Sequence, residues 1–164
     1  MVGISAVDEL AYGIRLIETL RREDVETHVV VSRDASRALG ADAARVQTVA
    51  AHTYAPENQA ARISSGSFLT RAMVVAPCDT SSVAAIVMGL ATNLVYRAAD
   101  VTLKEGRPVA LGIPATAFER IPADIRARAA AVPGLKLLPL AGPPDEAVAA
   151  LLAQVGVEGA SVPA

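Results

Sequence analysis

Cysteine and histidine are scarce in this chain, and their scarcity excludes two kinds of site. Cys78 is the one cysteine of the sequence, so it cannot form a disulfide within the chain. A lone thiol with two histidines, His28 and His52, does not make a zinc site, and we expect both histidines to be structural. The sequence therefore predicts no metal site and a reducing, cytoplasmic location.

Long apolar runs and a basic stripe are missing as well. Met1 leads directly into the strand-like run Val2 to Ser5, without a basic n-region or a long apolar segment, so we expect neither a signal peptide nor a membrane anchor. The formal net charge is -2, and charges of both signs are scattered along the chain. This pattern argues against a nucleic-acid partner.

Apolar residues, by contrast, are abundant. The 164 residues fit one domain, predicted over 1–155, followed by a flexible C-terminal tail over 156–164. Hydrophobic residues make up 52% of the chain, which is more than one small domain usually needs to fill its own core. We therefore expect a homo-oligomer that buries several apolar faces.

Short apolar runs alternate with longer segments of helical period, which is typical of βαβ units around a parallel sheet. The predicted strands are Val2 to Ser5, Thr27 to Ser32, Ala72 to Ala76, Pro108 to Gly112 and Leu135 to Leu140. Apolar residues at helical spacing lie between them, at Leu10, Ile14, Ile17 and Leu20 and again at Val83, Ile86, Val87 and Leu90. The predicted fold class is α/β, a Rossmann-like three-layer sandwich with a mainly parallel sheet.

Hydroxyl side chains follow two of the predicted strands. Ser32 comes after the second strand, and Thr80, Ser81 and Ser82 come after the central one. Ligands of open parallel sheets bind beyond the carboxyl ends of the strands, where hydroxyls and free amides suit a phosphate. The alternative is that Ser32 and Thr80 or Ser81 are ordinary helix N-caps.

Two further segments have both a binding and a structural interpretation. The run from Ile63 to Phe68 contains small residues that allow a backbone to approach a ligand closely, or it is a connecting loop. Arg97 and Lys104 are seven residues apart, so on a helix they share a face and could grip a phosphate. The alternative is a solvated face with ion pairs to Asp100 and Glu105.

Three segments in this order resemble the flavin prenyltransferase (UbiX-like) family. They are Ile63 to Phe68 with its Ser-Gly-Ser-Phe loop, Met73 to Cys78 with its Pro-Cys strand end, and Arg97 to Pro108 with its Arg-Ala-Ala-Asp-Val-x-Leu-Lys-Glu helix. The resemblance extends from Val2 to Leu140. It implies FMN bound between subunits of a large homo-oligomer, a dodecamer being one such form. It also implies transfer of a dimethylallyl group from dimethylallyl phosphate to the flavin, to serve a partner decarboxylase.

The resemblance also assigns roles by position. Ser32 and Ser82 would meet the FMN phosphate, and Arg97 and Lys104 would hold phosphate charge. Ser65 to Ser67 would border the flavin from a neighbouring subunit. The expected cofactor-binding residues are Ser5, Asp8, Ser32, Ser65, Gly66, Ser67, Thr80, Ser82 and Arg97. The expected catalytic residues are Asp8 and Lys104.

The chain departs from the family at three places. Its first turn reads Ser5-Ala6-Val7-Asp8, so that Asp8 stands where the family has a flavin-facing serine. The Arg-Glu-Thr-Pro segment, whose glutamate serves proton transfer, is replaced here by Pro114 to Ala117. The Tyr and Arg that the family's C-terminal region supplies to the prenyl phosphate have no counterparts after Leu140.

These departures leave three hypotheses. The first is an enzyme that modifies flavin or uses it in a decarboxylase-like reaction. The second is a flavin-binding accessory subunit that does not prenylate, and the third is an oligomeric scaffold that has lost the ligand. Asp8 either faces the flavin, where its charge would disfavour the anionic reduced form, or caps the first helix.

Overall fold

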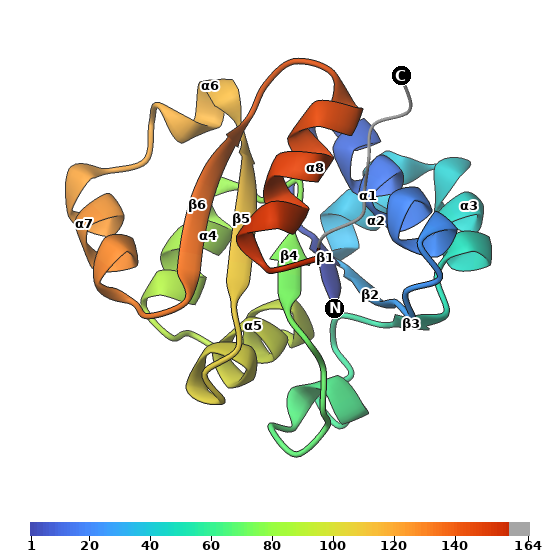
Figure 1. The fold of residues 1–164 in the computed structure, drawn as a ribbon, viewed down its shortest axis with the longest axis horizontal. Helices are drawn as coiled ribbons and strands as arrows, with labels where there is room; N and C mark the ends of the chain where they lie inside the picture. The colour runs from blue at the N-terminus through green and yellow to red at the C-terminus, as the bar shows by residue number, and fades with distance from the viewer. Residues whose placement is uncertain (158–164) are drawn as a thin grey trace.

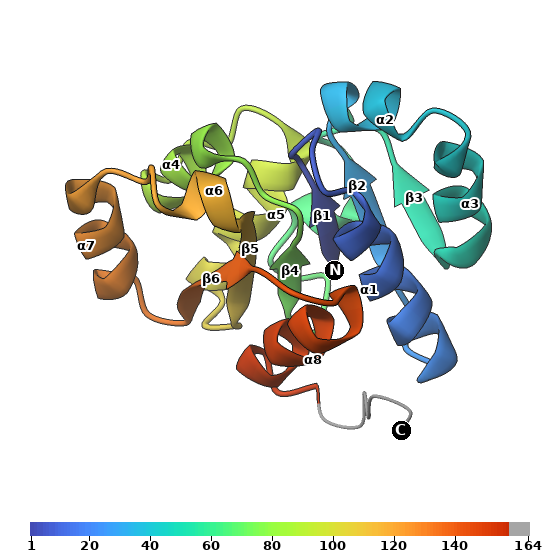
Figure 2. The same ribbon diagram turned by 90° about the horizontal axis from the view of Figure 1, so that it is seen from above.

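The computed structural model describes residues 1–157, and within that span six strands form one sheet in which every pairing is parallel (Figures 1 and 2). The strand order is β3-β2-β1-β4-β5-β6. The strands are β1 (Val2–Ile4), β2 (His28–Val31), β3 (His52–Tyr54), β4 (Met73–Val75), β5 (Val109–Pro114) and β6 (Leu135–Leu140). The α/β class and the Rossmann-like arrangement are confirmed, and the sheet is wholly rather than mainly parallel.

Helices cover both faces of the sheet, which gives the predicted three layers. They are α1 (Ala11–Arg22), α2 (Arg33–Leu39), α3 (Asp42–Val49), a 3₁₀ turn η1 (Arg62–Ser64), α4 (Thr80–Val87), α5 (Leu94–Lys104), α6 (Ala115–Phe118), α7 (Ala123–Ala131) and α8 (Pro144–Gln154). One core cluster lies between the sheet and α1 and α8, and the other lies between the sheet and α4 and α5 (Figure 2). Within residues 1–157, no helix combines the length and apolar character that a membrane crossing requires.

The order of the strands places a crevice beside β1. The chain winds outward from β1 through β2 to β3, then returns to β4 on the other side of β1 and winds outward again. Because the connections on either side of β1 run in opposite directions, the carboxyl ends of β1 and β4 are the topological switch point of the sheet. Ligands of open α/β sheets bind at such a point.

The sequence prediction fails at an edge strand and at one helix end. β3 was not predicted, because its His-Thr-Tyr segment has no apolar run. Leu90 lies beyond the end of α4 and is 54% exposed, so it does not extend that helix's apolar stripe. Residues 158–164 of the predicted tail lie outside the described residues, and the domain boundary at 155 stays a prediction.

Candidate functional site

A cavity of about 660 Å³ opens at the carboxyl edge of the sheet, at the switch point. Its lining comes from the segments that follow β1, β2, β3 and β4 and from the start of α5. The lining residues are Ser5, Val7, Ser32, Arg33, Asp34, Pro56, Glu57, Gln59, Asp79, Ser81, Ser82, Thr92, Asn93 and Tyr96. The structure therefore brings together three of the predicted site residues, Ser5, Ser32 and Ser82.

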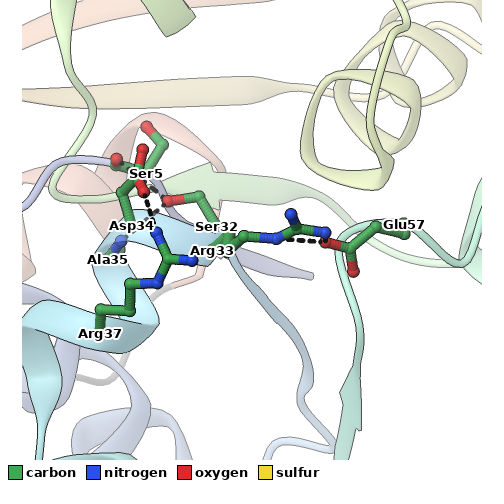
Figure 3. Close-up of polar contacts among 7 residues, drawn as sticks. All are labelled: Ser5, Ser32, Arg33, Asp34, Ala35, Arg37 and Glu57. Atoms are coloured by element: carbon green, nitrogen blue, oxygen red, sulfur yellow. Dashed lines mark hydrogen bonds and ion pairs between the residues drawn. The ribbon is translucent and has the colours of Figure 1, made fainter.

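Ser32 joins the ends of β1 and β2. Its Oγ donates to the carbonyl oxygen of Ser5 at 3.2 Å and accepts from the backbone N–H of Ala35 at 3.2 Å (Figure 3). The second contact makes Ser32 the N-cap of α2, as the structural alternative expected. An Oγ in this position still lines the cavity, so capping and ligand contact are compatible for this residue.

Asp79 is the N-cap of α4, so the alternative in which Thr80 or Ser81 caps this helix is wrong. Its carboxylate accepts from the backbone N–H of Ser82 at 2.8 Å and from the Ser82 hydroxyl at 3.0 Å. The Ser82 Oγ also lies 3.1 Å from the Tyr96 hydroxyl. The Ser82 hydroxyl is therefore already hydrogen-bonded, and the residue is fully buried. Thr80, another predicted site residue, is not part of the cavity lining.

The cavity's charged groups are three carboxylates and one guanidinium, from Asp34, Glu57, Asp79 and Arg33. Arg33 reaches across the opening to Glu57, with its Nε 2.9 Å and its Nη2 2.5 Å from Glu57 Oε1 (Figure 3). These hydrogen bonds lower the pKa of Glu57. Arg37, one turn further along α2, forms an ion pair with Asp34, with Arg37 Nη1 3.3 Å from Asp34 Oδ1. Arg33 is therefore the cation placed to meet an anionic ligand in this cavity.

Asp8 lies on the turn between β1 and α1 but does not line the cavity. Its side chain is exposed, and the N-cap of α1 is Leu10. The neighbouring Glu9 has a positive φ of 55°. In the described chain Asp8 therefore neither faces the cavity nor occupies the N-cap position, and its predicted catalytic role stays a prediction.

The Ser65 to Ser67 loop lies away from this cavity, because it precedes β4 and so belongs to the amino edge of the sheet (Figure 1). The Ser65 and Ser67 hydroxyls are exposed and 2.8 Å apart. A Cβ added at Gly66 would collide with the Glu105 carboxylate, so this position requires glycine unless Glu105 moves. Arg107 anchors the loop, because its Nη2 donates a hydrogen bond to the Gly66 carbonyl oxygen at 3.1 Å.

Arg97 and Lys104 share a face of α5, as predicted, and Arg97 contacts the same loop. Arg97 Nε donates to the Ser64 carbonyl at 3.2 Å. Lys104 Nζ lies 2.8 Å from Asp100 Oδ2, and Arg97 Nη1 lies 3.9 Å from the same oxygen. Both cations thus pair with Asp100. Because the side chains of Arg97 and Lys104 are 43% and 69% exposed, each can also contact a second anion.

Cys78 is a small, buried hydrophobe. Its side chain has no exposed surface, and burial raises the pKa of the thiol. Its backbone N–H donates to the Gly112 carbonyl at 2.7 Å, which ties the end of β4 to β5. Cys78 supplies no nucleophile to the cavity.

Sequence reasoning missed three of the residues that shape the cavity, Arg33, Glu57 and Tyr96. Arg33 follows Ser32 directly, so its place beyond β2 is evident in the sequence, although it was not predicted as a site residue. The place of Glu57 is not evident, because it follows β3, which the pattern did not reveal. Tyr96 reaches Ser82 from α5, and this contact between two successive helices depends on how α4 and α5 pack against each other.

Comparisons with known proteins agree with this geometry. Residues 1–130 match the model of the family described as Flavoprotein. The chain is 44% identical over 115 residues to a probable UbiX-like flavin prenyltransferase of Bacillus subtilis (strain 168), a match covering 68% of this chain and 56% of the relative. It is 41% identical over 121 residues to flavin prenyltransferase UbiX of Escherichia coli (strain K12), covering 71% of this chain and 64% of the relative. The matched part thus spans about three fifths of these relatives' length.

Solved structures match over nearly the whole chain. A dodecameric FMN-dependent UbiX-like decarboxylase from Escherichia coli O157:H7 superposes with a TM-score of 0.86 at 31% identity, covering 96% of this chain and 94% of that one. The protein AnUbiX (PadA1), in complex with FMN and dimethylallyl pyrophosphate, gives a TM-score of 0.82 at 28% identity, covering 94% and 89%. Both are folded in the same way as the chain described here.

Proposed function

This chain belongs to the flavoprotein family and, within it, to the UbiX-like flavin prenyltransferases, and on that basis we propose that it binds FMN at the carboxyl edge of its sheet. The observation that carries the proposal is the cavity at the switch point, where Ser5, Ser32 and Ser82 meet from the ends of three different strands. We propose prenyl transfer to the flavin as the activity.

The cavity fits a flavin in size and in most of its chemistry. Its volume of about 660 Å³ lies within the range of small-molecule sites. Hydroxyls of Ser5 and Ser32 and the guanidinium of Arg33 suit a phosphate. Asp79 is the exception, because its carboxylate holds the Ser82 hydroxyl and N–H that a phosphate would use. The flavin would supply the ring that accepts the prenyl group, and the chain's residues would bind and orient it.

The site is completed, in this proposal, by a second copy of the chain. The Ser65 to Ser67 loop lies at the amino edge of its own sheet, so it can reach a cavity only on a neighbouring molecule. Arg97 and Lys104 lie beside the same loop and would bring two cations to a phosphate there. A homo-oligomer would also bury Leu69, which is 87% exposed in the single chain.

A flavin-binding accessory subunit is the second candidate. The observation that favours it is the segment after β5, where Pro114 ends the strand and Ala115 begins α6 without an acidic side chain. General acids and bases contribute about 10²- to 10⁴-fold to a rate, so their loss would leave only slow turnover. In either case we propose a cytoplasmic protein whose flavin serves a partner decarboxylase.

The test is to add FMN to the purified chain and measure the flavin absorbance that co-elutes with it. The bound FMN is then reduced with dithionite under anaerobic conditions, which makes the flavin ring nucleophilic, and dimethylallyl phosphate is added, whose phosphate is the leaving group. We expect FMN to co-elute with an oligomer, and the mass of the extracted flavin to rise by one dimethylallyl group. Bound FMN of unchanged mass would support the accessory subunit. A chain that retains no flavin would contradict both candidates.

Arg97→Ala and Lys104→Ala, made singly, should each weaken FMN or dimethylallyl phosphate binding to the oligomer about tenfold. The reason is that a hydrogen bond to a charged group is worth about 1.5–3 kcal/mol, of which the existing pairs with Asp100 offset part. Titration calorimetry measures the affinity. Arg128→Ala, an exposed cation on α7, is the matched control. Unchanged affinity in both variants would mean that these cations form only a solvated, ion-paired face.

A further inference from the structure

The two histidines of the chain lie side by side on the sheet, away from the flavin cavity. His28 and His52 are the first residues of β2 and β3, and they are direct partners in the register of these parallel strands. Their rings stack with centroids 4.6 Å apart and planes inclined by 15°. The separation follows from the spacing of neighbouring strands, which is about 4.8 Å. Both rings therefore lie on the same face of the sheet, His52 with its side chain 45% exposed and His28 buried with its side chain 7% exposed.

Glu26 adds a carboxylate to this pair from the segment before β2. Its Oε1 lies 3.2 Å from His28 Nε2 and 3.1 Å from His52 Nε2, and the three ligand atoms lie within 4.8 Å of one another. Bonds of about 2.0–2.2 Å to a tetrahedral ion place ligand atoms roughly 3.3 Å apart. The Glu26 contacts already have this spacing. A tilt of His52, whose side chain is 45% exposed, would bring the two nitrogens to it.

Tyr54 and Phe68 hold the His28 ring in place. The Tyr54 hydroxyl lies 2.8 Å from His28 Nδ1, and Phe68 packs edge-on against the ring with centroids 5.0 Å apart. Histidine ligands of metals commonly hydrogen-bond through the ring nitrogen that does not bind the metal. With Tyr54 at Nδ1, the Nε2 of His28 is the nitrogen directed at Glu26 and His52.

We propose that Glu26, His28 and His52 bind a divalent first-row transition metal ion such as Zn²⁺, with water in the fourth position. Two imidazoles and a carboxylate are a ligand set that Zn²⁺ uses in sites with an open position. Among residues 1–157 this is the one group of three or more His, Cys, Asp or Glu side chains with converging ligand atoms. Cys78, the one thiol of the chain, is buried and does not compete for the metal.

The metal would fasten an edge strand to the sheet. β3 has three residues and, in the described sheet, pairs only with β2, so no second strand holds it in place. A shared ion would tie the first residue of β3 to the first residue of β2. The competing arrangement is a metal-free one, in which the Glu26 carboxylate accepts hydrogen bonds from both rings.

The experiment is a Zn²⁺ titration of the untagged, chelator-treated chain by calorimetry, with Co²⁺ as a spectroscopic probe. We expect one Zn²⁺ per chain, visible Co²⁺ bands of a four-coordinate site, and a higher melting temperature with Zn²⁺. His52→Ala and Glu26→Gln should each weaken Zn²⁺ binding by about 100-fold. Tyr54→Phe should weaken it about 10- to 100-fold, since it removes an outer-shell partner.

Glu23→Gln is the matched control, because Glu23 is an exposed carboxylate three residues before Glu26. Its Zn²⁺ affinity should equal that of the unaltered chain. His52 and Glu26 are exposed, so their variants should keep the far-UV circular dichroism of the folded protein. If the unaltered chain takes up no Zn²⁺, or if His52→Ala binds it equally well, the proposal is wrong and the three side chains form a hydrogen-bonded network.

Discussion

Replacing Asp79 with serine should tighten FMN binding about 10- to 100-fold and leave riboflavin binding unchanged. Two unit charges about 5 Å apart near a protein surface interact by roughly 3 kcal/mol, before screening by solvent reduces the effect. The Asp79 carboxylate faces the cavity and holds the Ser82 hydroxyl and N–H, so it both repels a phosphate and occupies its donors. Serine keeps a good N-cap for α4 while it removes the charge.

The test measures the affinities of FMN and riboflavin for the unaltered protein and for Asp79→Ser by fluorescence quenching. The quantity compared is the ratio of FMN affinity to riboflavin affinity in each protein. Riboflavin lacks the phosphate, so it reports any general change in the cavity. Asp124→Ser is the control, because Asp124 is an exposed acid in the first turn of another helix, α7. Equal changes for both flavins would place the phosphate away from α4, and Arg33 would then be its main partner in this chain.

The strands that could be predicted are those with buried apolar runs. β1, β4 and β5 are buried along their whole lengths, so hydrophobic residues dominate their sequences. β3 is an edge strand with exposed His52 and Thr53. Its position is fixed by hydrogen bonds to β2, and a sequence pattern does not contain that information.

The cavity was predictable in position but not in its internal bonding. Strand ends and hydroxyls indicated the carboxyl edge of the sheet, and Ser5, Ser32 and Ser82 do line one cavity there. The segment from Asp79 to Ser82 offers four residues that all cap helices well. Which of them caps α4 depends on where the chain leaves β4, and that choice decides whether the helix end carries a negative charge.

The cluster of Glu26, His28 and His52 shows the same limit of pattern reasoning. His28 and His52 are 24 positions apart in sequence, so no ligand spacing connects them. They meet because β2 and β3 are neighbours in parallel register. Without β3, His52 had no partner, and the structural interpretation of both histidines was the natural one.

Gly13→Val should destabilise the protein by about 2 kcal/mol, because it overpacks a close contact between a helix and the sheet. Gly13 lies in α1, at a point where that helix closely approaches the ends of β1 and β4. A Cβ at this position would be 2.7 Å from the Ala76 carbonyl oxygen and 2.8 Å from Ile4 Cδ1. The Ile4 methyl could rotate away, but the Ala76 oxygen belongs to the backbone at the end of β4 and cannot.

Helix propensity acts in the opposite direction and is too small to prevail. Replacing a helical glycine gains at most about 1 kcal/mol, whereas overpacking a rigid contact costs about 1–3 kcal/mol and β-branching adds further crowding. Ala11→Val is the matched control, since Ala11 is exposed in the same helix and should lose only about 0.5 kcal/mol.

Urea unfolding at one fixed protein concentration would compare the variants, because the stability of an oligomer depends on the concentration of its protomers. Gly13→Val should also affect the cavity, because the turn from Ser5 to Leu10 leads directly into α1 and its residues Ser5 and Val7 line the cavity. Displacing the helix from Ala76 would shift that turn, so FMN affinity should fall together with stability. If Gly13→Val unfolded at the same urea concentration as Ala11→Val, the close approach of α1 to β4 would not be a constraint on the fold.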